Sequence, residues 1–172
     1  CFVCERDGED IHFDHTLERC CPRCGTDVHI DWSKASQVLN HLAAHILFDP
    51  AIERANEPCG FCLQPAPQCL FFLRKGHSHD SGLQVDAKRT RGCAKALSFR
   101  YKSARTSSAH SPSSNVPIVC PFCPKDAPAV WKYNFEQHCA KSHKGSRIDD
   151  YKDLFTISAS ENDGLKQLWR SR

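Results

Sequence analysis

Apolar side chains at helical spacing predict a helix in the first third of the chain. Val38 and Leu42 lie about one helical turn apart, so both side chains point to the same face. Asp31 or Ser33 is suitable as the cap of this helix, and we expect the helix to end near Leu47.

A second helix is predicted near the C-terminus. The sequence Ser158-x-x-Glu161 matches a capping box, in which each side chain bonds to the backbone N–H of the other residue. Leu165, Leu168 and Trp169 then fall on one face. We expect this face to pack against the rest of the protein.

Two segments between these helices have strand-like patterns, and a third is polar. Residues 70–73 (Leu-Phe-Phe-Leu) form a short apolar run and predict a buried strand. Residues 97–102 (Leu-Ser-Phe-Arg-Tyr-Lys) alternate, which predicts a strand with its charged side chains on one face. Residues 103–115 are rich in Ser and predict a flexible linker or a long loop.

Two Cys-x2-Cys pairs are each followed by two histidines about one helical turn apart. The first set is Cys21, Cys24, His41 and His45, and the second is Cys120, Cys123, His138 and His143. Thiolate and imidazole ligands at this spacing suit a closed, tetrahedral Zn²⁺ site, so we predict one zinc ion in each set. Cys20 is an alternative to Cys21, and Cys139 is expected to be an ordinary thiol.

A third pair, Cys59-x2-Cys62, has no paired histidines after it. Among the cysteines and histidines that follow, we favour Cys69 and Cys93 as its partners in a further zinc site. His77 and His79 lie in a polar loop and are expected at the surface.

A fourth Cys/His group stands at the start of the chain. Its members are Cys1, Cys4, His12 and His15, whose spacing also suits a metal. The chain has 12 Cys and 10 His. It contains no Met, even at position 1, so we expect a fragment or a processed chain. An even Cys count also allows a disulfide framework, but the Cys-x2-Cys pairs favour zinc in a reducing compartment.

Charge is distributed unevenly along the chain, although the net charge is only +3. Residues 1–58 carry 11 acidic and 5 basic side chains, whereas residues 59–125 carry 2 acidic and 10 basic ones. Seven bases and no acid lie between residues 87 and 105: Lys88, Arg89, Arg91, Lys95, Arg100, Lys102 and Arg105. Such a block can bind phosphates or acidic proteins, or it can be a solvated face.

The two Cys2His2 sets resemble C2H2-type zinc fingers. The phrases at residues 57–62, 114–118 and 129–134 also resemble a family of uncharacterised zinc-finger-containing proteins of mushroom-forming (basidiomycete) fungi. The resemblance covers residues 21–169 and implies metal binding and a nuclear or nucleic-acid context, without an established activity.

The expected fold is a set of small α+β, zinc-stabilised modules, with two C2H2-like ββα fingers flanking a Cys-rich basic β module. The expected segments are 1–20 (a loose Cys/His segment), 21–48 (finger), 59–105 (basic module), 106–119 (Ser-rich linker), 120–144 (finger) and 145–172 (tail with a helix). Modules of this size bury little apolar surface, which is why they need a metal.

Two function classes follow. The first is a zinc-binding, nucleic-acid-binding regulatory protein, nuclear or otherwise intracellular, that uses the seven bases between residues 87 and 105. In a groove-reading array the base-contacting positions would be Lys34, Gln37 and Asn40 in one finger and Trp131, Asn134 and Gln137 in the other.

The alternative function is a zinc-scaffolded adaptor that binds a protein through the C-terminal helix. An enzyme with a small-molecule substrate is not expected, since closed zinc sites cannot activate water. A membrane partner is not expected either, since no apolar run is long enough to span a bilayer.

Overall fold

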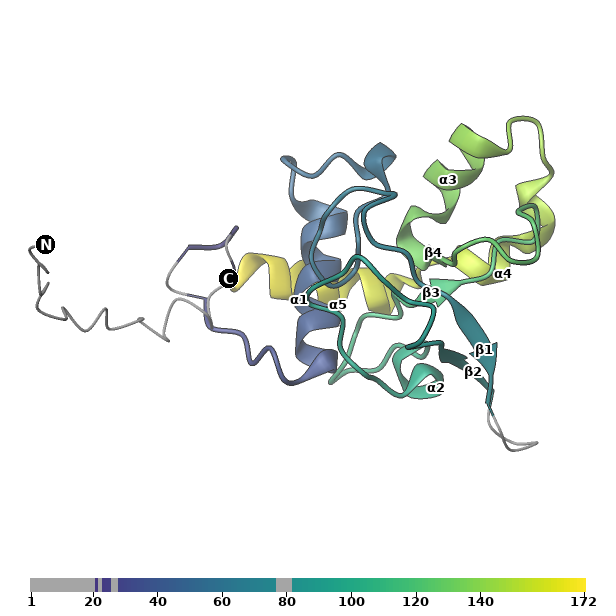
Figure 1. The fold of residues 1–172 in the computed structure, drawn as a ribbon. Coiled ribbons are helices and arrows are strands. Elements are labelled where there is room, and N and C mark those ends of the chain that lie inside the picture. The colour runs from purple at the N-terminus through teal and green to yellow at the C-terminus, as the bar shows by residue number, and fades with distance from the viewer. Residues whose placement is uncertain (1–20, 22, 26–27, 77–81) are drawn as a thin grey trace, which may run out of the picture. The chain divides into compact units, whose positions relative to one another are not determined.

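The computed structural model describes residues 21, 23–25, 28–76 and 82–172 (Figure 1). The chain divides into a unit of residues 1–30 and a unit of residues 31–172. The predicted N-terminal metal group of Cys1, Cys4, His12 and His15, together with Cys20, His77 and His79, lies outside the described residues. In the first unit, the Cys24 N–H donates to the Cys21 carbonyl at 3.1 Å, as in a tight turn.

Two helices pack together in the second unit. Helix α1 (Ala35–Phe48) lies against helix α5 (Ala159–Arg170), and Figure 1 shows the two helices crossing. The buried side chains of this core are Ala43, Ala44, Ile46, Tyr133 and Leu165. The predicted packing of the C-terminal helix against the body is therefore confirmed, although Leu168 stays 38% exposed.

Two short antiparallel sheets complete the unit. Strand β1 (Leu73–Lys75) pairs with β2 (Leu83–Val85), and Leu73 lies opposite Val85. Strand β3 (Pro117–Ile118) pairs with β4 (Val130–Trp131), and Ile118 lies opposite Val130. This arrangement confirms the expected small α+β fold.

Short helices follow or connect these strands. After β4 the chain enters the 3-10 helix η3 (Lys132–Asn134) and then α3 (Phe135–Ser142). The others are η2 (Arg54–Asn56), α2 (Tyr101–Ala104), η4 (Ile148–Tyr151) and α4 (Lys152–Phe155). No helix of the described residues has the length and apolar character that crossing a bilayer requires.

A second core joins the β3–β4 pair to α2 and α3. Its buried members are Tyr101, Val116, Ile118, Cys120, Val130, Phe135 and Cys139. The Tyr101 hydroxyl donates to the Pro117 carbonyl at 2.7 Å, so the one polar atom of this side chain is satisfied inside the core. Residues 31–172 thus form one compact unit, in which the segments expected as separate modules share buried side chains.

The strand predicted at residues 97–102 is wrong. Residues 97–100 have no regular structure, and Tyr101 opens the short helix α2. The reason is tertiary: Tyr101 is anchored in the core, while Leu97 and Phe99 are only half-buried. The strand predicted at residues 70–73 is confirmed only at its end, because regular pairing begins at Leu73.

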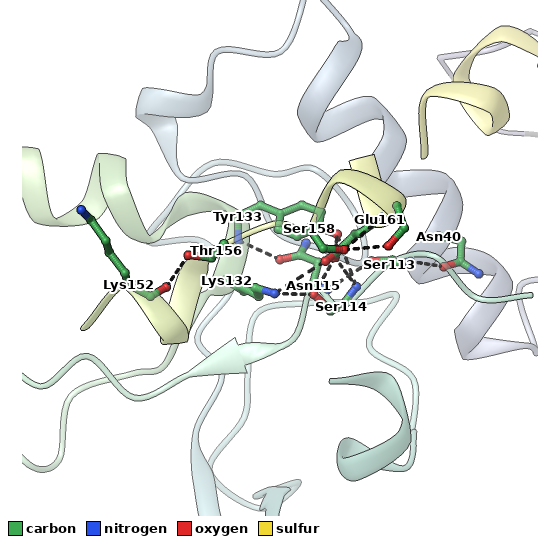
Figure 2. A network of polar contacts seen from close by, with 11 residues as sticks. Asn40, Ser113, Ser114, Asn115, Lys132, Tyr133, Lys152, Thr156, Ser158 and Glu161 are labelled. Carbon is green, nitrogen blue, oxygen red and sulfur yellow. Dashed lines mark hydrogen bonds and ion pairs between the residues drawn. The ribbon is translucent and has the colours of Figure 1, made fainter. Parts of the chain in front are cut away.

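The Ser-rich segment is not a flexible linker at its C-terminal end. Ser113, Ser114 and Asn115 are 4%, 2% and 1% exposed. Figure 2 shows why: Glu161 of α5 accepts hydrogen bonds from the Ser114 backbone N–H at 2.7 Å and from its hydroxyl at 2.5 Å. The Tyr133 hydroxyl also donates to Glu161. Because these bonds satisfy buried polar groups, a segment of linker-like composition packs inside the protein.

Only one of the predicted helix caps is present. The Ser158 hydroxyl accepts from the Glu161 N–H at 3.1 Å, which is one half of the predicted capping box, whereas the Glu161 carboxylate accepts from Ser114 and Tyr133 instead. Asp31 instead accepts from the Ser33 N–H and hydroxyl, and α1 begins after Lys34 without a side-chain cap. Asn134 precedes α3, but its amide donates to the Pro58 carbonyl at 2.8 Å.

Candidate metal centres

Four cysteines from three loop segments meet in the first cluster. Cys59 and Cys62 lie in a tight turn closed by a bond from the Leu63 N–H to the Cys59 carbonyl at 2.9 Å. Cys69 and Cys93 flank the bridge between Leu70 and Arg91. We name these four residues the Cys4 centre.

Gly92 is what lets two of these loops approach each other. It has a φ of +86°, and a Cβ at this position would lie 1.9 Å from the Gln68 carbonyl oxygen. Any other residue would therefore be strained and would push Cys93 away from Cys69.

The sulfur positions suit a tetrahedral metal. The Sγ atom of Cys62 lies 3.4 Å from that of Cys69 and 3.6 Å from that of Cys93, and Cys59 and Cys93 are 3.8 Å apart. All four sulfurs lie within 4.8 Å of one another. Zn–S bonds of about 2.3 Å in a tetrahedron place sulfurs about 3.8 Å apart, close to these values. A disulfide bond would need about 2.05 Å, and none of the described cysteines from Cys59 to Cys139 forms one.

The four thiols also need a cation to ionise together. Hydrogen bonds from Cys59 and Cys93 lower the pKa of Cys62 to about 2. The pKa of Cys59 is raised by the hydrogen bond between Cys59 and Cys62, and burial raises the pKa of Cys69 to about 12. The close sulfurs thus oppose the joint ionisation of the four thiols, and a bound divalent cation would favour the loss of their protons.

The second cluster lies between β3 and α3. Cys120 and Cys123 occupy the turn after β3, whereas His138 lies in α3 and His143 directly follows it. These residues offer four ligand atoms within 4.8 Å of one another, and we name them the Cys2His2 centre. His143 is five residues after His138, at the C-cap of α3, where the backbone is no longer helical.

Distances in the Cys2His2 centre also suit zinc. The Cys123 Sγ atom lies 3.3 Å from Nε2 of His138 and 3.1 Å from Nε2 of His143. Zn–S bonds of about 2.3 Å and Zn–N bonds of about 2.0–2.1 Å give an S···N separation of about 3.6 Å, so the rings need to move by about 0.3–0.5 Å. Small rotations of the two imidazoles are sufficient for this.

A carboxylate holds one of these imidazoles. The Glu57 Oε2 atom lies 3.0 Å from Nδ1 of His138, and both side chains are nearly buried. A ligating histidine commonly gives its second nitrogen to a carboxylate, which fixes its tautomer and orientation. Sequence reasoning missed Glu57, because 81 residues separate it from His138.

Cys139 lies beside the Cys2His2 centre but is not one of its four residues. It is 1% exposed. Burial, followed by the nearby Cys120, raises the pKa of Cys139 to about 11. Its position outside the four clustered residues agrees with its expected role as an ordinary buried thiol.

The remaining predicted set is divided between the two units. Cys21 and Cys24 belong to the first unit, and His41 and His45 to the second. Within the second unit the two Nε2 atoms lie 3.2 Å apart, and Nδ1 of His45 lies 2.9 Å from Asp49 Oδ2. Two Zn–N bonds of about 2.0–2.1 Å give an N···N distance of about 3.3 Å. The two histidines are thus suitably placed to bind one ion. That Cys21 and Cys24 bind the same ion stays a prediction.

Asp49 is a further residue beside a candidate metal site that sequence reasoning missed. Its position four residues after His45 was a usable signal, since side chains at i and i+4 meet on a helix. The contact parallels that between Glu57 and His138, so the two histidines have the same kind of second partner.

The seven predicted phosphate-binding bases, which we call the basic segment, are all exposed. They are Lys88, Arg89, Arg91, Lys95, Arg100, Lys102 and Arg105. None of them forms an ion pair with another described residue. The Arg89 guanidinium lies 4.3 Å from the centre of the Phe72 ring, and the Lys95 ammonium lies 4.1 Å from that of Trp32.

Compared with protein-family models, with curated proteins and with solved structures, the chain gives no match.

Proposed function

We propose that this protein is a zinc-binding regulatory module that uses its basic segment to bind nucleic acid. Zinc is supported by the ligand chemistry, because thiolate and imidazole in tetrahedral sets favour Zn²⁺ over hard cations such as Mg²⁺. Four protein ligands leave no open coordination position for water, which supports a structural role for the metal and argues against catalysis.

For the Cys2His2 centre we further propose a C2H2-like ββα finger. The order of its elements supports this: β3, the Cys120–Cys123 turn, β4 and then α3. The two strands are antiparallel, with Ile118 opposite Val130, and Phe135 of α3 is fully buried beside them.

Base reading by the helices is not part of this proposal. Three of the six positions that would read bases are buried, namely Asn40, Trp131 and Asn134. Asn40 Oδ1 accepts from the Ser113 N–H at 2.9 Å, and the Asn134 amide bonds to Pro58. Residues held in this way cannot reach a major groove.

The main support for the proposal is that the basic segment is exposed and makes no ion pair with a described residue. Seven exposed cations lie within 19 residues of chain, and none is neutralised by an ion pair with a described residue. The Cys4 centre holds this segment in place, because Cys93 lies between Arg91 and Lys95. Zinc therefore supports a surface of unbalanced positive charge, which favours a polyanionic partner.

The test is the salt dependence of binding. We would measure the affinity of the zinc-loaded full chain for fluorescent oligonucleotides across a range of salt concentrations. The variant Arg100→Gln/Lys102→Gln/Arg105→Gln is expected to bind about 10-fold or more weakly and to have a smaller salt slope, by about one per lost phosphate contact.

A matched control removes three exposed bases elsewhere in the chain. The variant Lys144→Gln/Lys166→Gln/Arg170→Gln has the same net charge as the first variant but an intact basic segment. It should bind within about 3-fold of the wild type. Equal loss in both variants, or binding that does not change with salt, would contradict the proposal.

The C-terminal helix gives less support to the alternative of a protein-binding adaptor. Leu165 is fully buried against α1, and Trp169 packs on the same core, so most of the apolar face is covered. Only Leu168 is left exposed.

A further inference from the structure

A groove of about 850 Å³ lies between the β1–β2 hairpin and residues 96–103. Part of its lining is apolar and includes the side chains of Leu83, Val85, Leu97 and Phe99. None of the four is buried, and Leu83 is 37% exposed. An apolar surface that is open to solvent in this way commonly marks a binding site.

The polar part of the lining is cationic. Arg74, Arg100 and Lys102 contribute to it, and no acidic side chain is among the described lining residues. Gln84 and Ser98 add neutral hydrogen-bonding groups. The groove therefore combines positive charge, which attracts phosphates, with apolar side chains, which attract flat rings.

Phe99 is held in place at this groove by other aromatic rings. Its ring centre lies 5.7 Å from that of Phe61 and 6.4 Å from that of Tyr101, with the latter ring tilted by only 25°. Tyr101 is in turn anchored by its bond to the Pro117 carbonyl. The half-exposed Phe99 ring is thus a supported platform of the kind on which a base stacks.

We infer that this groove binds single-stranded nucleic acid, with unpaired bases against the apolar lining and phosphates beside Arg100 and Lys102. The inference depends on the proposed function and makes it more specific. In a duplex the base faces are stacked on one another, so a duplex offers only its phosphates and groove edges to such a site. A single strand offers both phosphates and base faces.

The positions of the basic residues allow a direct test. Only Arg100 and Lys102 of the seven line the groove, whereas Lys88 and Arg91 do not. The variants Arg100→Gln/Lys102→Gln and Lys88→Gln/Arg91→Gln lose the same charge from the same segment. Their comparison separates the groove from a diffuse electrostatic surface.

The experiment uses the zinc-loaded full chain and fluorescence anisotropy. The probes are oligothymidine and oligouridine of about 12 nucleotides and a duplex of equal length. We expect the wild type to bind single strands at least about 10-fold more tightly than the duplex. Arg100→Gln/Lys102→Gln should lose about 10-fold in single-strand affinity, and Lys88→Gln/Arg91→Gln at most about 3-fold.

A third variant tests the apolar lining without changing charge. Leu83→Ser alters an exposed side chain, so the fold should be kept, and circular dichroism and zinc content check this. We expect it to weaken single-strand binding by about 3-fold or more while duplex binding stays the same.

The possible outcomes distinguish the two proposals. Equal affinities for single strand and duplex, or equal losses in the two charge variants, overturn the groove and leave the nucleic-acid function standing. No binding to any oligonucleotide overturns both. Displacement of the single strand by an acidic peptide of similar length and charge at equal concentration would assign the groove to a protein partner.

Discussion

The carboxylate of Glu57 lies 3.0 Å from Nδ1 of His138, a residue 81 positions later in the chain. Glu57 stands two residues before Cys59 and adopts a left-handed backbone conformation with a φ of 50°. The loop that opens the Cys4 centre therefore also orients a histidine of the Cys2His2 centre. Asn134 strengthens this link through its bond to the Pro58 carbonyl.

Packing between the same two segments is equally close. A Cβ on Gly60 would lie only 2.5 Å from an atom of the Trp131 ring. The Phe61 ring meets that of Trp131 edge-on, with centres 5.5 Å apart. The two centres are thus built on one shared interface.

Replacing Glu57 with Gln should weaken zinc binding at the Cys2His2 centre by about 10- to 100-fold, because His138 loses the carboxylate that orients it. Competition with a chromophoric chelator measures this affinity. Glu136→Gln removes an exposed carboxylate of α3 and should leave the affinity unchanged. A Glu57→Gln variant with wild-type affinity would mean that the contact does not tune the site.

Zinc content should respond differently to two buried or half-buried cysteines. Cys62→Ser is expected to lower the zinc content by one ion per chain, because it removes a ligand of the Cys4 centre. Cys139→Ser should retain the full content, since Cys139 is not one of the four residues of the Cys2His2 centre. Native mass spectrometry distinguishes the two results, and a loss of zinc from Cys139→Ser would reassign the ligands.

The set Cys21, Cys24, His41 and His45 is tested in the same way. His41→Ala should lower the zinc content by one ion, because a site with three protein ligands binds structural zinc less tightly. His110→Ala serves as the control, as this histidine is exposed and belongs to none of the predicted sets. Cobalt substitution adds a second measurement: the absorbance of tetrahedral Co²⁺ should fall by the contribution of one site. Unchanged metal content in His41→Ala would remove this predicted site.

Glu161→Gln should destabilise the zinc-loaded protein by about 2–3 kcal/mol. The reason is that buried donors from Ser114 and Tyr133 face a charged acceptor, with the Lys132 ammonium 3.8 Å away. Asp163→Asn, an exposed change in the same helix, should cost less than about 0.5 kcal/mol. Urea unfolding with metal in excess compares them, and equal midpoints for the two variants would contradict the prediction.

Local patterns were informative where the physical cause is itself local. The spacing of His41 and His45 predicts a helix because both side chains must share one face, and α1 runs from Ala35 to Phe48. The Ser158 cap was predictable for the same reason, since its partner is only three residues away. The alternation at residues 97–102 failed, because the burial of Tyr101 depends on a contact with Pro117 that no local pattern contains.

The sequence by itself determined the kinds of candidate metal ligand, their grouping into short turns and helices, and the concentration of positive charge between residues 87 and 105. Only the tertiary structure decided that Glu57 reaches His138, that Ser114 is buried under Glu161, and that Arg100 and Lys102 share a groove with Phe99. The physical reason is separation along the chain. Ligand spacing and helical periodicity act over a few residues, whereas burial and long-range hydrogen bonds depend on which distant segments pack together.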